Sequence, residues 1–246
     1  MKKIVYYFVV LFCFQLANAN VEKADVFFKE ANLLYHKGEY QAAAEIYQQI
    51  ENLNLESAEL YYNLGNCFYK MNQLPQAIYN YEKALKRKPA DEKIRNNLEV
   101  AYSKTIDNIP QKEISKPTLY LKSFLNFGGA FFLIMSCITS LMLLVLIGLY
   151  QINRKDSLKK PLKISVVVLV VFFVLSFLKF QLNNENVGIV FSTQTPLITL
   201  DKKQTVRNIH EGTKVIIEET NGPYLMVHLT DFSKGLIKKD AIKKVD

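Results

Sequence analysis

The sequence contains no tryptophan and has only three cysteines and three histidines in 246 residues. Cys13, Cys67 and Cys137 fall in three different segments, so we expect no disulfide framework. No CxxC pair or Cys/His cluster offers ligands for a metal ion, and we expect no metal or cofactor. The GxxxxGK, HExxH and GxSxG motifs are also missing. We therefore predict a protein that is not an enzyme.

Acidic residues are outnumbered by basic ones, 23 Asp and Glu against 31 Lys and Arg, which gives a formal net charge of +8. Such an excess is found in nucleic-acid-binding proteins and also in the topology signals of membrane proteins. Here five basic residues lie together in 151–163, with Asp156 as the one acid. The excess therefore indicates membrane topology, and we expect no nucleic-acid partner.

Charge is absent from one long stretch, residues 123–153. As a helix it would be about 46 Å long, more than a hydrocarbon core of about 30 Å. We place a first transmembrane helix at 127–150. A second apolar run, 164–182, would be about 28 Å long and has one charge, Lys179, near its end. The two runs predict a hairpin in contact with membrane lipid, and an apolar hairpin in the core of a soluble protein is the alternative.

The connector 151–163 orients this hairpin, because short loops rich in Lys and Arg stay in the cytoplasm. Residues 1–19 have the pattern of a secretory signal peptide, with Lys2 and Lys3, an apolar run and an A-x-A site that ends at Ala19. Retained as an anchor, the same segment would still direct the following chain outward. Both alternatives predict a multi-pass protein of a bacterial inner membrane, with its soluble parts in the periplasm.

A repeat follows the signal segment, and every matched pair of residues in it has the same offset, from i to i+34. An offset of this size indicates stacked helix pairs. A small residue in the first helix of each pair allows the second helix to approach closely, and an aromatic residue fills the space between them. Pro89 ends the second unit. The matching pairs are Ala31 and Gly65, Gly38 and Asn72, Tyr40 and Leu74, Ala43 and Ala77, Tyr47 and Tyr81, and Ile50 and Ala84.

On these residues the chain resembles the tetratricopeptide repeat family. Residues 58–91 match it best, whereas 24–57 have Glu30 where Leu is usual and Leu55 where Pro is usual. Residues 91–104 predict a third helix that caps the stack. About three units are usually needed for a stable stack, so neighbouring subunits or the juxtamembrane segment would complete it. The consensus positions are Tyr61, Leu64, Gly65, Phe68, Ala77, Tyr81, Ala84 and Pro89.

The inner faces of the first helices of such repeats line a concave surface. We predict that this surface binds a peptide, because Asn side chains can bond to an extended backbone and Tyr rings give rigid contact area. Ordinary repeat surface and aromatic packing are the alternative. The predicted binding residues are Phe28, Asn32, Tyr35, Tyr62, Asn66, Tyr69, Lys93 and Asn96.

Residues 187–246 change to short alternating runs separated by turns, which predicts a small closed β-barrel. The five expected strands are 187–191, 196–199, 213–217, 224–229 and 234–237. This part resembles a bacterial SH3-type domain in the segments Gly212-Thr213-Lys214-Val215, Gly222-Pro223-Tyr224 and Gly235-Leu236-Ile237. Leu236 stands where that family usually has Trp.

The expected fold is therefore a multidomain membrane protein with an all-α tetratricopeptide repeat solenoid, a two-helix transmembrane hairpin and a C-terminal all-β SH3-like barrel. Its predicted parts are a signal peptide at 1–19, repeats with a capping helix at 20–104, a linker at 105–122, transmembrane helices at 127–150 and 164–182 around a cytoplasmic loop at 151–163, and an SH3-like domain at 187–246.

In the order of these parts the chain resembles the BatE proteins of the bacterial aerotolerance (Bat) operons. The resemblance implies a non-enzymatic scaffold of the envelope, linked to stress or aerotolerance. Its implied partners are von Willebrand A-domain Bat proteins and other Bat components, including a MoxR-type ATPase. The alternative is a peptidoglycan-binding or envelope-sensing protein that acts through its SH3-like domain.

Overall fold

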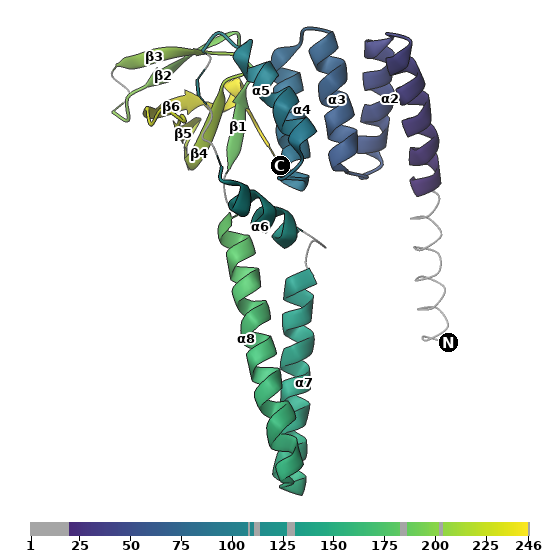
Figure 1. Cartoon of the computed structure of the whole chain (residues 1–246). Helices are drawn as coiled ribbons and strands as arrows, with labels where there is room; N and C mark the ends of the chain where they lie inside the picture. The colour runs from purple at the N-terminus through teal and green to yellow at the C-terminus, as the bar shows by residue number, and fades with distance from the viewer. Residues whose placement is uncertain are drawn as a thin grey trace, which may run out of the picture. The chain divides into compact units, whose positions relative to one another are not determined.

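The computed structural model describes residues 20–107, 109–110, 114–126, 131–182, 186–201 and 204–245 (Figure 1). They form two compact units. Residues up to 110 and from 186 onward make up one unit, and residues 114–182 make up the other. The predicted signal peptide, 1–19, lies outside the described residues.

Five helices in a row form the first part of the larger unit. They are the first helix (residues 20–36), α2 (Tyr40–Asn52), α3 (Ala58–Lys70), α4 (Leu74–Arg87) and α5 (Glu92–Ser103). Polar caps begin two of them, because Ser57 accepts a hydrogen bond from the Leu60 amide and Asp91 accepts from the amides of Lys93 and Ile94. Helix α5 lies within the segment 91–104 that was predicted as a capping helix.

The repeat offset predicted from sequence is reproduced in detail. Gly38 and Asn72 both have a positive φ, +84° and +60°, in the turn between the two helices of their pairs. The structure also explains why the second pair needs a small residue at position 65, because a Cβ on Gly65 would lie 2.5 Å from the ring of Tyr81. The first and second pairs are therefore equivalent structural units.

The C-terminal part of the same unit is one antiparallel sheet of seven strands. Its order is β3-β2-β6-β5-β4-β1-β7. The strands are β1 (Val187–Val190), β2 (Gln194–Ile198), β3 (Thr205–His210), β4 (Lys214–Asn221), β5 (Tyr224–His228), β6 (Lys234–Lys238) and β7 (Ile242–Lys244), with η2 (Lys239–Ala241) between the last two.

The prediction of a closed barrel is wrong, because the sheet is open. Among the described strands, β3 and β7 each pair with a single neighbour and not with each other. The helical part of the chain meets both ends instead. The carboxylate of Asp107 accepts a hydrogen bond from the His210 amide on β3, and Lys86 donates to the Val245 carbonyl just after β7. Each contact thus satisfies one backbone polar group near an end of the sheet.

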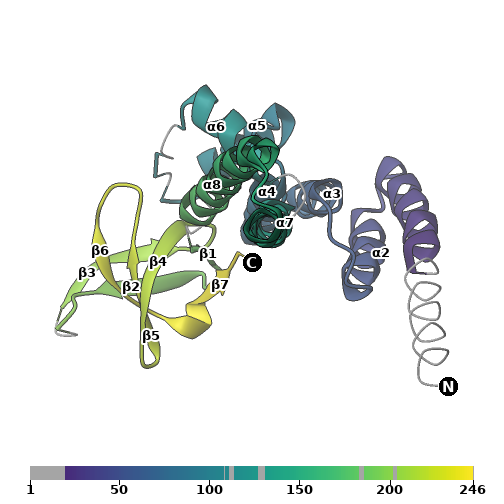
Figure 2. The same ribbon diagram turned by 90° about the horizontal axis from the view of Figure 1, so that it is seen from below.

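The repeats and the sheet share a hydrophobic core. Val187, Ile189 and Val245 of the sheet belong to the same cluster of buried side chains as the repeat helices. A second cluster lies within the sheet, and Ile109 packs against it. The sheet therefore packs at the α4–α5 end of the row of helices, opposite the first helix, as Figures 1 and 2 show.

The smaller unit contains α6 (Lys116–Asn126), α7 (Phe131–Asn153) and α8 (Lys159–Leu182), with the short helix η1 (Asp156–Leu158) in the turn between α7 and α8. Helix α6 occupies part of the segment predicted as a linker and packs against α8. Both α7 and the segment from Asp156 to Leu182 are long and apolar enough to cross a membrane. Only 11% and 6% of their most apolar windows are buried, which is the opposite of a soluble core hairpin.

Candidate peptide-binding face and the interface between repeats and sheet

A polar network joins the first three helices on the predicted binding face. The Oδ1 atom of Asn32 accepts hydrogen bonds from the Tyr47 hydroxyl at 2.6 Å and from the Asn63 amide at 3.4 Å. Tyr47 belongs to α2 and Asn63 to α3, so one carbonyl group links three consecutive helices. Burial raises the pKa of Tyr47, which keeps its hydroxyl protonated and able to donate.

The same network recurs one repeat later. Asn66 Oδ1 accepts from the Tyr81 hydroxyl at 2.7 Å and from the Asn97 amide at 2.9 Å. Asn97 also lies 3.1 Å from the Tyr62 hydroxyl, to which its amide donates. Since Asn97 is on α5, this helix takes the place of the first helix of a third repeat. The sequence prediction passed over Asn97, although its position one repeat after Asn63 was an available signal.

These contacts fix the orientation of Asn32 and Asn66. In each residue the carboxamide oxygen accepts two hydrogen bonds, while the Nδ2 group donates none within the described part of the chain. Both side chains are half-buried. A peptide carbonyl is the complementary acceptor for such a group. Equivalent amide donors on consecutive repeats suit an extended polypeptide that runs along the stack.

The four aromatic residues predicted for this face, Phe28, Tyr35, Tyr62 and Tyr69, are all half-buried. Phe28 packs edge-on against Tyr47, with 5.5 Å between the ring centroids. Tyr62 tilts against Tyr81 at 6.0 Å. Each ring thus uses part of its surface for packing within the repeats and leaves the remainder exposed, as a rigid contact surface requires.

The remaining predicted residues lie on or near α5. Lys93 and Asn96 are exposed, and the Lys93 backbone amide is held by the N-cap Asp91. The Lys104 ammonium lies 4.5 Å from the ring centroid of Tyr69. Lys104 follows α5, so the described structure places a positive charge beside Tyr69. The sequence pattern did not indicate this neighbour.

A buried polar contact joins the repeats to the sheet. Glu82 Oε1 on α4 accepts hydrogen bonds from the Tyr102 hydroxyl and from the Lys214 ammonium, each at 2.7 Å. The Glu82 and Lys214 side chains are largely buried. Burial and the neighbouring carboxylate of Glu82 raise the pKa of Tyr102 well above its usual value, so this phenol remains a donor. The contact connects α4, α5 and β4.

A second contact lies just after α5. The Asp107 carboxylate accepts hydrogen bonds from the His210 backbone amide at 2.8 Å and from the Thr213 hydroxyl, and it lies 2.9 Å from His210 Nδ1. Burial acts to raise the pKa of Asp107, but these contacts outweigh it and hold the pKa below its usual value. The start of the predicted linker is therefore fixed to the sheet.

Aromatic packing completes this interface. Tyr79 of α4 meets Phe191 edge-on at 5.9 Å, and the Lys243 ammonium lies 4.4 Å from the Tyr79 ring centroid. The signal for this interface was a difference between the two repeats at matching positions. Where α4 has Tyr79 and Ile78, α2 has the exposed Glu45 and the small Ala44.

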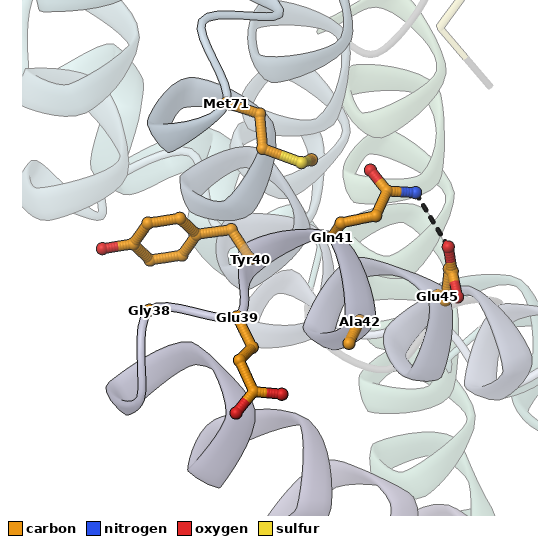
Figure 3. Close-up of a pocket in the computed structure, with 7 residues that line it drawn as sticks. All are labelled: Gly38, Glu39, Tyr40, Gln41, Ala42, Glu45 and Met71. Carbon is orange, nitrogen blue, oxygen red and sulfur yellow. Dashed lines mark hydrogen bonds between the residues drawn. The ribbon is translucent and has the colours of Figure 1, made fainter.

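Cys67 and the surface hollow shown in Figure 3 offer little for chemistry. Burial raises the pKa of Cys67 to about 12, so its thiol stays protonated near neutral pH. The hollow has a volume of about 460 Å³ and contains none of the predicted binding residues; within it the Gln41 amide donates to Glu45. Within the described ranges, no group of three or more His, Cys, Asp or Glu could hold a metal ion. The hollow is lined by Gly38, Glu39, Tyr40, Gln41, Ala42, Glu45 and Met71.

Comparison with known proteins agrees with this geometry for one segment. The family model of the tetratricopeptide repeat matches residues 58–91, which are α3, α4 and the turn that follows them. No curated protein matches the chain. Repeats of this family generally mediate binding between proteins. The helix pair at 58–91, with its network around Asn66, is therefore a tetratricopeptide repeat.

Proposed function

We propose that this protein is a non-enzymatic, membrane-anchored scaffold that holds an extended segment of a partner protein on the inner face of its repeats. The observation that carries the proposal is the duplicated network, which leaves the Nδ2 donors of Asn32 and Asn66 available in equivalent positions. A bound backbone supplies carbonyl acceptors at regular intervals, whereas a small ligand does not.

The chemistry of the face favours an uncharged or mildly polar segment. Asn and Tyr predominate among the predicted residues, and Lys93 is the one charged member of the set. Tyr62 and Tyr69 can pack against apolar side chains of the segment while the Asn amides bond to its backbone. Affinity would then come from aromatic contact area and from hydrogen bonds to the backbone of the segment rather than from charge.

The anchor in this proposal is the hairpin of α7 and α8. Both helices are long and apolar enough to span a bilayer, and the basic residues between them favour a cytoplasmic turn. The repeats and the sheet would then lie in the periplasm of a bacterial cell. On the order of its parts, we further propose that the protein acts in a Bat-type envelope complex linked to stress or aerotolerance.

The replacement Asn66→Asp tests the binding face. Aspartate keeps an acceptor for Tyr81 and Asn97 but removes the free amide donor and adds a charge that repels a peptide carbonyl. Loss of such a bond at a half-buried position is worth about 1–3 kcal/mol, or roughly 5- to 150-fold in affinity.

The measurement is quantitative pull-down from membranes by the full-length tagged protein, read by mass spectrometry. Gln48→Glu, an equivalent amide-to-carboxylate change at an exposed position of α2, is the matched control. Proteins that the wild type and the control both enrich should be lost with Asn66→Asp. Equal capture by all three proteins would refute peptide binding on this face.

Peptidoglycan binding is the second candidate, and one feature of the sheet favours it. In the turn between β5 and β6, Phe232 has a φ of +65° and is 87% exposed. An exposed aromatic ring can pack against a sugar ring. Because the sheet shares its core with the repeats, the test is sedimentation of the full chain with purified peptidoglycan. Retention that Phe232→Ala abolishes would support this candidate, and absence of retention would contradict it.

A further inference from the structure

Three equivalent positions are buried on both α3 and α5, the helices that follow α2 and α4 in the row. On α3 these positions are Leu60, Leu64 and Cys67, and all three are buried where α2 packs against α3. On α5 the equivalent residues, one repeat later, are Ile94, Leu98 and Ala101. They too are buried, where α4 packs against α5. Burial of this stripe is thus common to the two helices, α3 and α5, that have another helix pair before them.

The equivalent stripe on the first helix is not covered. It consists of Val26, Glu30 and Leu33, and the exposed fractions of Val26 and Leu33 are 61% and 62%. No helix pair precedes this one within the described ranges, and Figures 1 and 2 both place it at the end of the row. The other end of the row is covered by the sheet. Within the described residues, the stack therefore has one end that the sheet covers and one end at which two large apolar side chains are exposed.

The charges on and beside this stripe are arranged for self-association. Glu22, Lys29 and Glu30 are exposed and share the helical spacing of Val26 and Leu33, and the exposed Lys37 lies in the turn that directly follows the helix. If a second first helix lay antiparallel, about a twofold axis between residues 29 and 30, every close pair would match. Val26 would meet Leu33 of the other copy, Lys29 would meet Glu30, and Glu22 would meet Lys37. A parallel arrangement in register would instead place each charge opposite itself.

We propose that the open end binds the same face of a second copy of this chain, in this antiparallel register. The two stacks then cover each other's apolar stripe, as a neighbouring repeat would. A contact between two short helices is small compared with a standard interface of about 1,600 Å², so it is weak between freely diffusing molecules. Confinement of both copies to one bilayer raises their effective concentration, and in this respect the inference rests on the proposed membrane anchor.

The register is tested by cross-linking two differently tagged full-length chains in membranes, with Cys13 and Cys137 replaced by serine. One chain carries Val26→Cys and the other Leu33→Cys, and a bismaleimide with a short spacer is the cross-linker. The antiparallel register predicts at least tenfold more cross-linked heterodimer for this combination than for Val26→Cys on both chains. Equal yields from the two combinations, or no cross-linked dimer, would overturn the proposal.

A charge swap tests the same pairing without cysteines. Lys29→Glu places two acids in each of two close pairs and should abolish the dimer seen by lysine-independent photocross-linking in membranes. Adding Glu30→Lys to the same chain restores opposite charges and should restore the dimer, while Lys70→Glu, at an exposed position on α3, should have no effect. Self-association would be refuted if the double variant did not recover the dimer. It would also be refuted if the stripe were cross-linked to a different protein instead of a second copy. Partner capture through Asn66 is measured separately, so the two proposals can fail independently.

Discussion

Lys214→Met is the most direct test of whether the repeats and the sheet form one cooperative unit. The change removes the ammonium that bonds to Glu82 at 2.7 Å and leaves that largely buried carboxylate with the Tyr102 hydroxyl as a donor. Breaking a buried ion pair by removing one partner costs about 3–5 kcal/mol. At about 1.4 kcal/mol per tenfold change, this corresponds to roughly 150- to 4,000-fold faster hydrogen exchange wherever exchange requires the interface to open.

The assay is hydrogen exchange with mass spectrometry on the full chain in lipid nanodiscs. Exchange should accelerate in α4 and α5 as well as in β1 and β4, because both sides of the interface lose the same contact. Lys234→Met, which removes an exposed ion pair with Glu218 inside the sheet, is the matched control and should leave the repeats unchanged. If Lys214→Met accelerates exchange in the sheet alone, the sheet is an independent domain and the shared core has no energetic role.

Two further predictions concern single contacts. Gly65→Ala should destabilise the unit by about 1–3 kcal/mol in denaturant unfolding of the full chain, because the added Cβ meets the Tyr81 ring at 2.5 Å, whereas Gly148→Ala meets nothing within 4 Å among the described residues. Asp107→Asn should remove an acid-sensitive part of the stability. The folded-state pKa of Asp107 is lowered, so its contribution is present above the ordinary aspartate pKa of about 3.9 and is lost as the pH falls through the folded-state value. Thermal unfolding from pH 7 to pH 3 should therefore show a smaller loss for Asp107→Asn than for the wild type; equal losses would contradict this role of Asp107.

The repeat was predictable because its signals are local and recur. Gly65 and Tyr81 occupy fixed positions within one repeat, and a helix pair needs only such short-range pairings to be specified. The two apolar helices were predictable for a similar reason, since their length and lack of charge are properties of continuous segments.

The open sheet was harder to predict, because two of its strands give almost no pattern. In β3 only Ile209 is buried, so the alternation that marks a half-buried strand is missing. Strand β7 has only three residues. With these two strands unseen, the five remaining runs indicated a small closed barrel. An edge strand held by Asp107 from another part of the chain does not need an apolar face of its own.

The interface was missed because its partners are far apart in sequence. Glu82 and Lys214 are separated by 132 positions, and neither residue has a distinctive local context. The candidate binding face was predicted only in part for a related reason. Asn32 and Asn66 were found by their repeat positions. Asn97 lies one repeat after Asn63, but its contact with Asn66 became evident only from the hydrogen bonds of the structure.

The interruption of the larger unit by residues 114–182 has a consequence for biosynthesis. A ribosome that adds about 5–20 residues per second needs roughly 7–26 s to advance from Glu82 to Lys214, a separation of 132 positions. During that interval the side of α4 that packs against the sheet, where Tyr79 meets Phe191, lacks the strands that cover it. Nascent chains that stall between the two halves should accordingly be held by chaperones and be sensitive to proteases until the last strand has been made.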